Sequence, residues 1–205
     1  MLPVRVPLAV QKPEIPGIEV SMIAYLLLLL AVLSRFLPLA GGSFHIGWMN
    51  FTAVGGVLLY FGARRSWREM LAPLAVLVAT DYCLTTFVYH YSFSWQAYVP
   101  TWLWYVAAMA LGQILLKART SFTRVASGAL LGPTSFFAVS NFAVWMGGGM
   151  YPHTLGGLWA CYVAAIPFYR NDLLSTALVC AAAFGLPVLV RRFSAPPAVA
   201  VVAGK

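Results

Sequence analysis

The residues of this chain whose types suggest a functional site are a few polar side chains within or beside long apolar runs. Asp81 stands well inside one run, and Asn141 stands in the last part of another. The others, at the edges of such runs, are Arg35, Asn50, Arg170 and Asp172. Charged and amide groups are costly to bury in apolar surroundings unless they are paired or bind something. These residues therefore indicate either pairing between helices or a polar site for a small molecule.

The composition of the chain explains why each of these few polar residues is informative. Of 205 residues, 61% are hydrophobic and 9% are charged, and the mean hydropathy is +0.83. A soluble domain carries about 25% charged residues to cover its surface, so most of this surface must face lipid. The sequence therefore predicts an all-α integral membrane protein.

The apolar runs predict a six-helix transmembrane bundle in one domain, residues 18–192, between flexible tails at 1–17 and 193–205. The expected helices are 18–37, 50–63, 70–89, 102–116, 125–145 and 172–190. A further apolar stretch, 155–168, has Pro167 near its end and is shorter than the roughly 20 residues that one crossing needs. We expect it to form an extra short helix, re-entrant or interfacial, in the last outer loop. Small residues four apart, such as Ala108 and Gly112, predict close helix packing.

The basic residues predict the orientation. With the N-terminus inside and six crossings, eleven of the thirteen Lys and Arg residues fall on the inner side. Only Arg35 and Arg170 fall outside, whereas a seventh crossing would also move Arg191 and Arg192 there. Because cytoplasmic loops are enriched in Lys and Arg, we expect a multi-pass protein of the plasma (inner) membrane with both termini in the cytoplasm. The net charge of +8 follows from these groups and does not indicate nucleic-acid binding.

The predicted outer loops are long and rich in aromatic residues, glycine and histidine. They are residues 38–49, 90–101 and 146–169. Loops that only connect helices are usually short, so these loops suggest a cover over a site. Because the polar residues lie in the same half, we interpret them as the lining of a solute cavity open to the outside. The alternative is a structural network, in which an arginine neutralises an aspartate and the asparagines link helices.

Metal and enzyme signatures are missing. His45, His90 and His153 lie in the predicted outer loops, but their spacing matches no ligand motif, so neither a metal nor another cofactor is expected. The chain has no GxSxG, HExxH or P-loop motif, so it is not expected to be an enzyme or to hydrolyse ATP. Two alternatives stay open: a small membrane enzyme with Asp81 and a loop histidine as acid and base, and an assembly subunit without a ligand.

Several segments carry a resemblance to known proteins. They are Ser34-Arg35, NFTAVG at 50–55, Asp81 and SNFAVWMGGGMYPHTLGGLWACYVAAIPFYRNDLL at 140–174. Over roughly residues 22–192 the chain resembles an uncharacterised group of small bacterial membrane transport proteins. In helix number and loop arrangement it also resembles the substrate-binding S components of energy-coupling-factor (ECF) transporters.

The resemblance to S components implies a subunit that binds a small solute, vitamin-like or a metal, beneath the outer loops. It also implies a separate transmembrane coupling subunit and ATPases. One departure is that residues 18–37 lack the AxxxA spacing that S components often use for docking. Asp81 and Arg35 would set the charge of the cavity, and Tyr151 and His153 would form part of a lid. The predicted substrate-binding residues are Asn141, Trp145, Asn50, Asp81, Arg35, Tyr151, His153 and Arg170.

Overall fold

The structure, a computed structural model, describes residues 17–42, 46–147 and 149–194, and this part of the chain is helical without any strand. The α-helices are α1 (Gly17–Ser34), α2 (Val54–Arg64), α3 (Leu71–Cys83), α4 (Trp95–Leu116), α5 (Phe122–Gly147), α6 (Leu155–Cys180) and α7 (Leu186–Ser194). The π-helical turn Leu84–Val88 extends α3, and a second one, Ala181–Gly185, joins α6 to α7. Short 3₁₀ turns at Leu37–Gly42 and Ile46–Trp48 lie between α1 and α2. His45 and the predicted tails lie outside the described residues, apart from Gly17 in α1 and Phe193 and Ser194 in α7.

Four helical segments are long and apolar enough to cross a membrane. They are Leu71–Val88, Trp95–Leu116, Phe122–Gly147 and Leu155–Val190. The apolar parts of α1 and α2 are shorter. The exposed surface is also apolar: Leu26, Leu29 and Leu33 of α1 are each more than half exposed. The expected all-α fold is therefore confirmed for the described residues, and exposed apolar faces of this size are typical of helices in contact with lipid.

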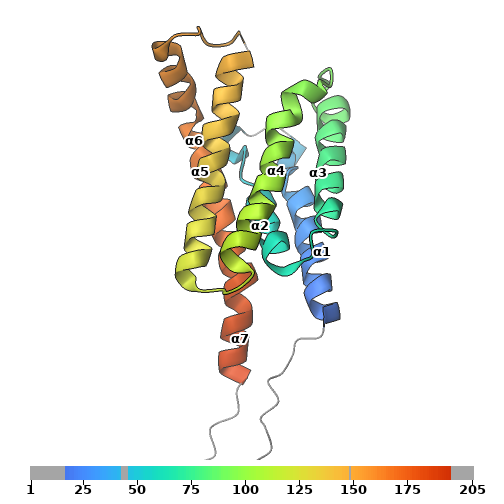
Figure 1. Cartoon of the computed structure of the whole chain (residues 1–205). Helices are drawn as coiled ribbons and strands as arrows, with labels where there is room; N and C mark the ends of the chain where they lie inside the picture. Colours follow the sequence, from blue (N-terminus) through green and yellow to red (C-terminus); the bar gives the residue numbers. More distant parts are fainter. Residues whose placement is uncertain (1–16, 43–45, 148, 195–205) are drawn as a thin grey trace, which may run out of the picture.

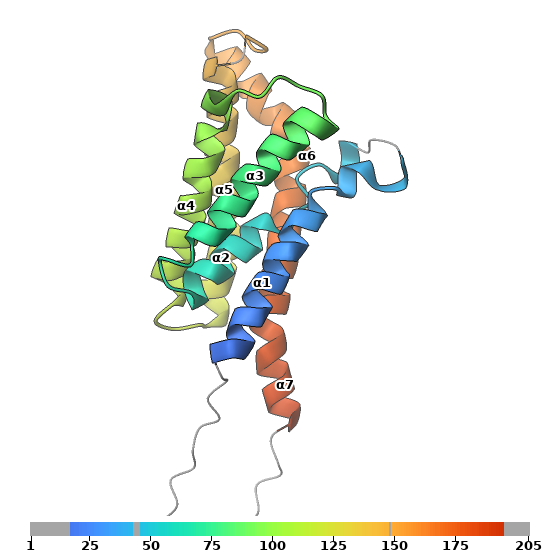
Figure 2. The same ribbon diagram turned by 90° about the vertical axis from the view of Figure 1, so that its right-hand side faces the viewer.

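The short helix α2 forms the centre of the bundle. It packs against α1, α4, α5 and α6, and Figures 1 and 2 show the longer helices around it. Its residues from Val54 to Ala63 are all buried. At its start, the backbone N–H of Ala53 donates to Oγ of Ser34 at 2.9 Å, which fixes the end of α1 against the start of α2. A helix that is apolar on all sides is stable only when it is enclosed, and α2 meets this condition.

The contact between α2 and α4 depends on two glycines. A Cβ atom at Gly62 would lie 1.9 Å from the carbonyl oxygen of Met109, and one at Gly112 would lie 2.2 Å from that of Leu59. Any side chain at either position would overlap with backbone, so the two helices approach this closely only because both residues are glycine. The predicted role of Ala108 and Gly112 in helix packing is therefore confirmed.

The region after residue 154 differs from the prediction. The expected short helix 155–168 and the first part of the expected helix 172–190 form one continuous helix, α6, and the rest of 172–190 follows in the π-helical turn and α7. The prediction of an extra short helix in a loop is therefore wrong. Thr154 caps the first turn of α6 by accepting a hydrogen bond from the Gly157 N–H at 3.1 Å. Pro167 lies inside α6. Proline removes one backbone donor, and neighbouring helices can compensate for this in membrane proteins, so it does not end the helix here.

Two other helix boundaries also differ. The fourth helix begins at Trp95 instead of residue 102, with Pro100 inside it, so it takes up half of the predicted 90–101 loop. The second begins at Val54 instead of residue 50, because Asn50 has a φ of 59°, which a helix does not allow.

The apolar segment Leu155–Val190 has 36 residues. At 1.5 Å per residue it is about 54 Å long, so part of it must lie outside a hydrocarbon core of about 30 Å.

Basic side chains gather at one end of the molecule, which we call the basic end. The α2–α3 and α4–α5 connections lie there, together with the start of α1 and the end of α7 (Figures 1 and 2). The basic residues of these connections and their flanks are Arg64, Arg65, Arg68, Lys117, Arg119 and Arg124.

Glu69 pairs with Arg65 in the α2–α3 connection. Hydrogen bonds from the Ser66 backbone N–H and hydroxyl, with Arg65, hold the pKa of Glu69 below its usual value.

Candidate functional site

A polar cavity with two adjoining lobes lies inside the bundle, next to the N-terminal end of α2. Each lobe has a volume of about 190 Å³, and both are lined by Asn50, Phe136 and Asp172. The first lobe also contains Arg35, Thr52, Val54, Gly55, Asp81, Tyr98, Thr101, Trp104 and Tyr105. The second also contains Phe137, Ser140, Asn141, Ala165, Phe168 and Tyr169. The helix α2 is short, and α3 to α6 extend beyond its N-terminal end (Figure 2).

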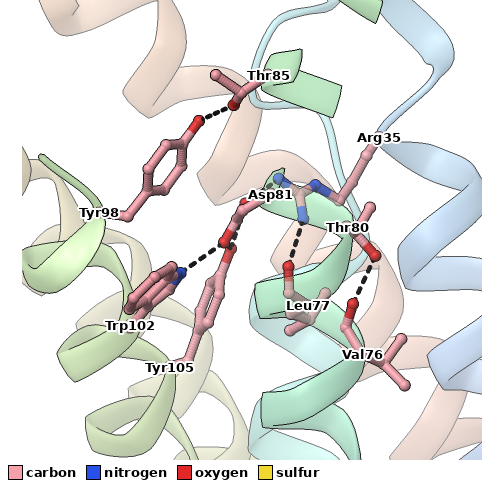
Figure 3. A network of polar contacts seen from close by, with 9 residues as sticks. All are labelled: Arg35, Val76, Leu77, Thr80, Asp81, Thr85, Tyr98, Trp102 and Tyr105. Carbon is pink, nitrogen blue, oxygen red and sulfur yellow. Dashed lines mark hydrogen bonds and ion pairs between the residues drawn. The ribbon is translucent and has the colours of Figure 1, made fainter. Parts of the chain in front are cut away.

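On the wall of the first lobe, Arg35 and Asp81 form an ion pair (Figure 3). Arg35 follows the last residue of α1, and Asp81 lies in α3 with 1% of its side chain exposed. The guanidinium also donates to the carbonyl oxygen of Leu77 at 3.4 Å. The pair therefore joins α1 to α3, as the structural interpretation of these charged residues predicts.

Two aromatic residues of α4 complete the environment of Asp81. Trp102 donates its indole N–H to the carboxylate at 2.9 Å, and the Tyr105 hydroxyl lies 3.3 Å from the same oxygen (Figure 3). Thr85 and Tyr98 form a further hydroxyl pair between the end of α3 and α4. Because Asp81 already has an ion-pair partner and aromatic donors, it links three helices and is poorly available to a solute.

Asp172 of α6 is in a different situation. It is 6% exposed and lines both lobes of the cavity. Its carboxylate accepts one long hydrogen bond, from Oγ1 of Thr176 at 3.4 Å. Neither of the two ion pairs found among the described residues involves Asp172. It is thus a buried carboxylate that faces a cavity and, within the described part of the chain, forms no ion pair.

The turn before α2 presents Asn50 to both lobes. Asn50 adopts the left-handed conformation with a φ of 59°, which asparagine tolerates better than most residues. The turn is held by Asn171 of α6, whose amide donates to the carbonyl oxygens of Gly47 at 2.7 Å and Met49 at 2.9 Å. Our sequence reasoning missed Asn171. Its only signal was its position beside Asp172, and its role depends on contact with a segment more than a hundred residues away.

In the second lobe, α5 contributes Asn141 and Ser140. The Asn141 amide N–H donates to the carbonyl oxygen of Phe137 at 2.8 Å, one turn earlier in the same helix. The side-chain oxygen of Asn141 makes no such bond and can accept a hydrogen bond from a bound molecule. The Ser140 hydroxyl donates to the carbonyl oxygen of Phe136 at 2.6 Å and keeps an acceptor lone pair. The polar groups of this lobe are therefore mainly acceptors.

The predicted site residues divide into two groups. The structure brings four of them to the walls of the cavity: Arg35, Asn50, Asp81 and Asn141. The other four, Trp145, Tyr151, His153 and Arg170, do not line it. Arg170 is exposed on α6, one residue before Asn171.

Trp145 belongs to a separate cluster at the end of α5. Its indole N–H donates to the carbonyl oxygen of Pro152 at 3.0 Å, and its ring packs edge-on against His153 at 5.5 Å between ring centroids. These contacts hold the α5–α6 connection against α5.

Within the described part of the chain, no three His, Cys, Asp or Glu side chains come together to hold a metal ion. The cavity can therefore offer a molecule one carboxylate, amide and hydroxyl oxygens and aromatic walls.

Comparison with known proteins gives one match. Residues 18–199 match a family of unknown function, DUF6580. No curated protein and no solved structure matches the chain.

Proposed function

The chain belongs to the DUF6580 family of unknown function, and we propose that it binds a small solute in the polar cavity as the substrate-binding subunit of a membrane transport system. One observation carries this proposal: Asp172 and the amide of Asn50 line both lobes of a cavity inside an otherwise apolar bundle. Buried polar groups around an open space in apolar surroundings are typical of ligand sites.

The distribution of charge supports a cavity in the outer half of the membrane. Under the positive-inside rule the basic end faces the cytoplasm. In this orientation the helices cross the membrane six times, with α1 and the short α2 as two of the crossings and α7 as the inner extension of α6. The start of α1 and the end of α7 then both lie on the cytoplasmic side of the plasma membrane. The N-terminal end of α2, where the cavity lies, points away from the basic end (Figure 2).

Energy for transport would come from other chains. The sequence has no P-loop, so ATP hydrolysis requires separate subunits. We propose an arrangement like that of ECF transporters, in which this chain is the S component and works with a transmembrane coupling subunit and ATPases. The support is the resemblance in the number of crossings proposed here; helices α4 and α6 take up much of two of the three long outer loops expected from the sequence.

A second candidate is an assembly subunit without a ligand, and the Arg35–Asp81 network favours it. That network links α1, α3 and α4 and needs no solute. It leaves Asp172 and the second lobe unexplained, which is why we prefer the solute-binding function. A membrane enzyme with Asp81 as acid or base is less well supported, because donors from other side chains already engage this carboxylate.

Native mass spectrometry of the gently purified protein tests the proposal. We expect the wild type to retain a small molecule, and Asn141→Ala to lose it because the second lobe loses its amide. Trp145→Ala is the matched control: it also removes a polar side chain near the end of α5, but outside the cavity, and should keep the molecule. A wild type that is folded but carries nothing would contradict solute binding and favour the assembly subunit.

The orientation is tested by labelling of single cysteines in intact cells. In a background without native cysteines, Ser92→Cys in the α3–α4 connection should react with an impermeant maleimide. Arg68→Cys in the α2–α3 connection should react only after the cells are opened. The reverse pattern would place the cavity in the cytoplasmic half and would contradict uptake from outside.

A further inference from the structure

The charge balance of the polar cavity is set by Asp172. The cavity lining holds three charged side chains, and two of them, Arg35 and Asp81, neutralise each other. Asp172 is 6% exposed and faces both lobes, and among the described residues its carboxylate has only the Thr176 hydroxyl as a partner. When Asp172 is ionised, the cavity therefore carries one uncompensated negative charge.

The N-terminal end of α2 contributes to the same lobe of the cavity as Asp172. Val54 and Gly55, the first residues of α2, line the same lobe as this carboxylate. The N-terminal end of a helix carries a partial positive charge and unpaired N–H groups, which stabilise a nearby anion. This partial charge does not replace a counter-ion, because a buried carboxylate remains costly without a full positive charge beside it.

We infer that the solute is a small organic cation, an ammonium or similar group, and that Asp172 is its counter-ion in the cavity. The inference rests on the proposed function and specifies the class of substrate. It follows from an unpaired buried carboxylate that faces an open space, a position that a cationic ligand would complete.

The remaining walls suit an organic cation better than a metal ion. The second lobe is lined by aromatic rings, among them Phe136, Phe137 and Tyr169. The faces of such rings attract ammonium groups, and aromatic walls are the usual recognition site for quaternary ammonium. A hard metal cation would instead need several oxygen ligands around one point. The acceptor oxygens of Asn141 and Ser140 can take hydrogen bonds from N–H or O–H groups of the same molecule.

The size of the lobes limits the cation. Each lobe, at about 190 Å³, is smaller than the roughly 300 Å³ at which sites for drug-sized ligands begin. A small ammonium compound fits one lobe. An anion would meet the carboxylate at the junction of the lobes and would be repelled there.

Choline and its neutral isostere 3,3-dimethylbutan-1-ol test the inference on the purified full-length protein. The two molecules have the same shape and differ in the charged nitrogen, so they isolate the effect of charge. From the loss expected when a buried charge pair is broken, we expect choline to bind the wild type at least about thirtyfold more tightly than the isostere. Asp172→Asn, which keeps the shape of the side chain, should reduce this ratio to near one. Glu69→Gln, the same change at the basic end, should leave it unaltered.

The outcomes separate the inference from the proposed function. If the wild type does not prefer choline, or if Asp172→Asn keeps the preference, the inference is overturned. The comparison of the two probes on the wild type decides the question even if Asp172→Asn fails to fold. If a neutral or anionic molecule is retained in native mass spectrometry, the inference fails but solute binding stands. If the wild type retains nothing and binds neither probe, both fail.

Discussion

Replacement of Asp81 by asparagine tests whether the Arg35–Asp81 pair is a structural link between helices. Asparagine has nearly the same shape and can still accept hydrogen bonds from Trp102 and Tyr105. The change therefore removes the ion pair while it keeps most of the packing. What remains is a guanidinium with 15% of its side chain exposed, bonded only to the carbonyl oxygen of Leu77.

The size of the effect follows from this burial. Removal of one partner from a buried ion pair costs about 3–5 kcal/mol, because the other charge stays buried without compensation. Arg35 keeps some access to solvent, so we expect a loss near the lower limit, about 3 kcal/mol. Arg35→Met together with Asp81→Asn should recover much of this loss, with a coupling energy of about 2 kcal/mol or more.

The assay is reversible unfolding in mixed detergent micelles with increasing dodecyl sulfate, followed by circular dichroism. A double-mutant cycle of Arg35→Met and Asp81→Asn gives the coupling energy directly. The control is Glu69→Gln, which removes the ion pair between the partly exposed Glu69 and Arg65 and should lower the unfolding midpoint much less than Asp81→Asn does. A coupling energy below about 0.5 kcal/mol would refute the structural role of the pair, because residues in one buried network couple by about that much or more.

Three further predictions concern packing, the turn before α2 and pH. Gly112→Ala should destabilise the protein by about 3 kcal/mol, because its Cβ would lie 2.2 Å from the Leu59 carbonyl oxygen. Gly128→Ala is the control: the nearest atom to its Cβ would be 3.7 Å away, so it should be neutral or stabilising in the same unfolding assay. Asn171→Ala should cost about 1–2 kcal/mol by removing two partly buried hydrogen bonds to the turn, and hydrogen exchange at residues 47–50 should rise. The carboxyl carbon of Glu69, followed by NMR, should titrate below the ordinary pKa of glutamate.

Each of these predictions has a clear contrary result. Equal stability of the Gly112 and Gly128 variants would contradict backbone contact between α2 and α4. Unchanged exchange at 47–50 would mean that Asn171 does not hold the turn. For Glu69 the sign follows from the lowered pKa: its stabilisation of the α2–α3 connection is complete above the ordinary glutamate pKa and is lost as pH falls through the lowered value. A normal or raised pKa would contradict the Ser66 and Arg65 contacts.

Much of the fold was predictable because local rules govern it. Apolar runs in a chain with few charges predict membrane helices, and five of the six expected segments coincide with α1 to α5 within a few residues, apart from the early start of α4. The prediction was wrong around Pro167, where a local rule ends a helix and the structure continues it. Neighbouring helices in a membrane protein can compensate for the donor that proline removes, and the packing of α5 and α2 on α6 lies outside the reach of that local rule.

The candidate site, like the fold, could be predicted from the sequence only in part. The cost of burying polar groups identified Asp81, Arg35, Asn50 and Asn141 without any structure, and all four line the cavity. The same rule also selected Arg170, which is exposed, and the loop pattern selected Trp145, which packs on the α5–α6 connection. Burial cost shows that a polar residue needs a partner, but it does not show on which face of its helix the residue lies.

By itself, the sequence indicated a membrane protein, since a chain with 61% hydrophobic and 9% charged residues has few polar side chains with which to cover a soluble surface. It also determined which polar residues would need an explanation. Only the tertiary structure decided that Arg35 pairs with Asp81 and leaves Asp172 without a cation, and that a short α2 leaves a cavity beside it. The physical reason is that burial cost depends on residue type alone, whereas pairing depends on distances of a few ångströms between helices that the chain brings together from distant positions.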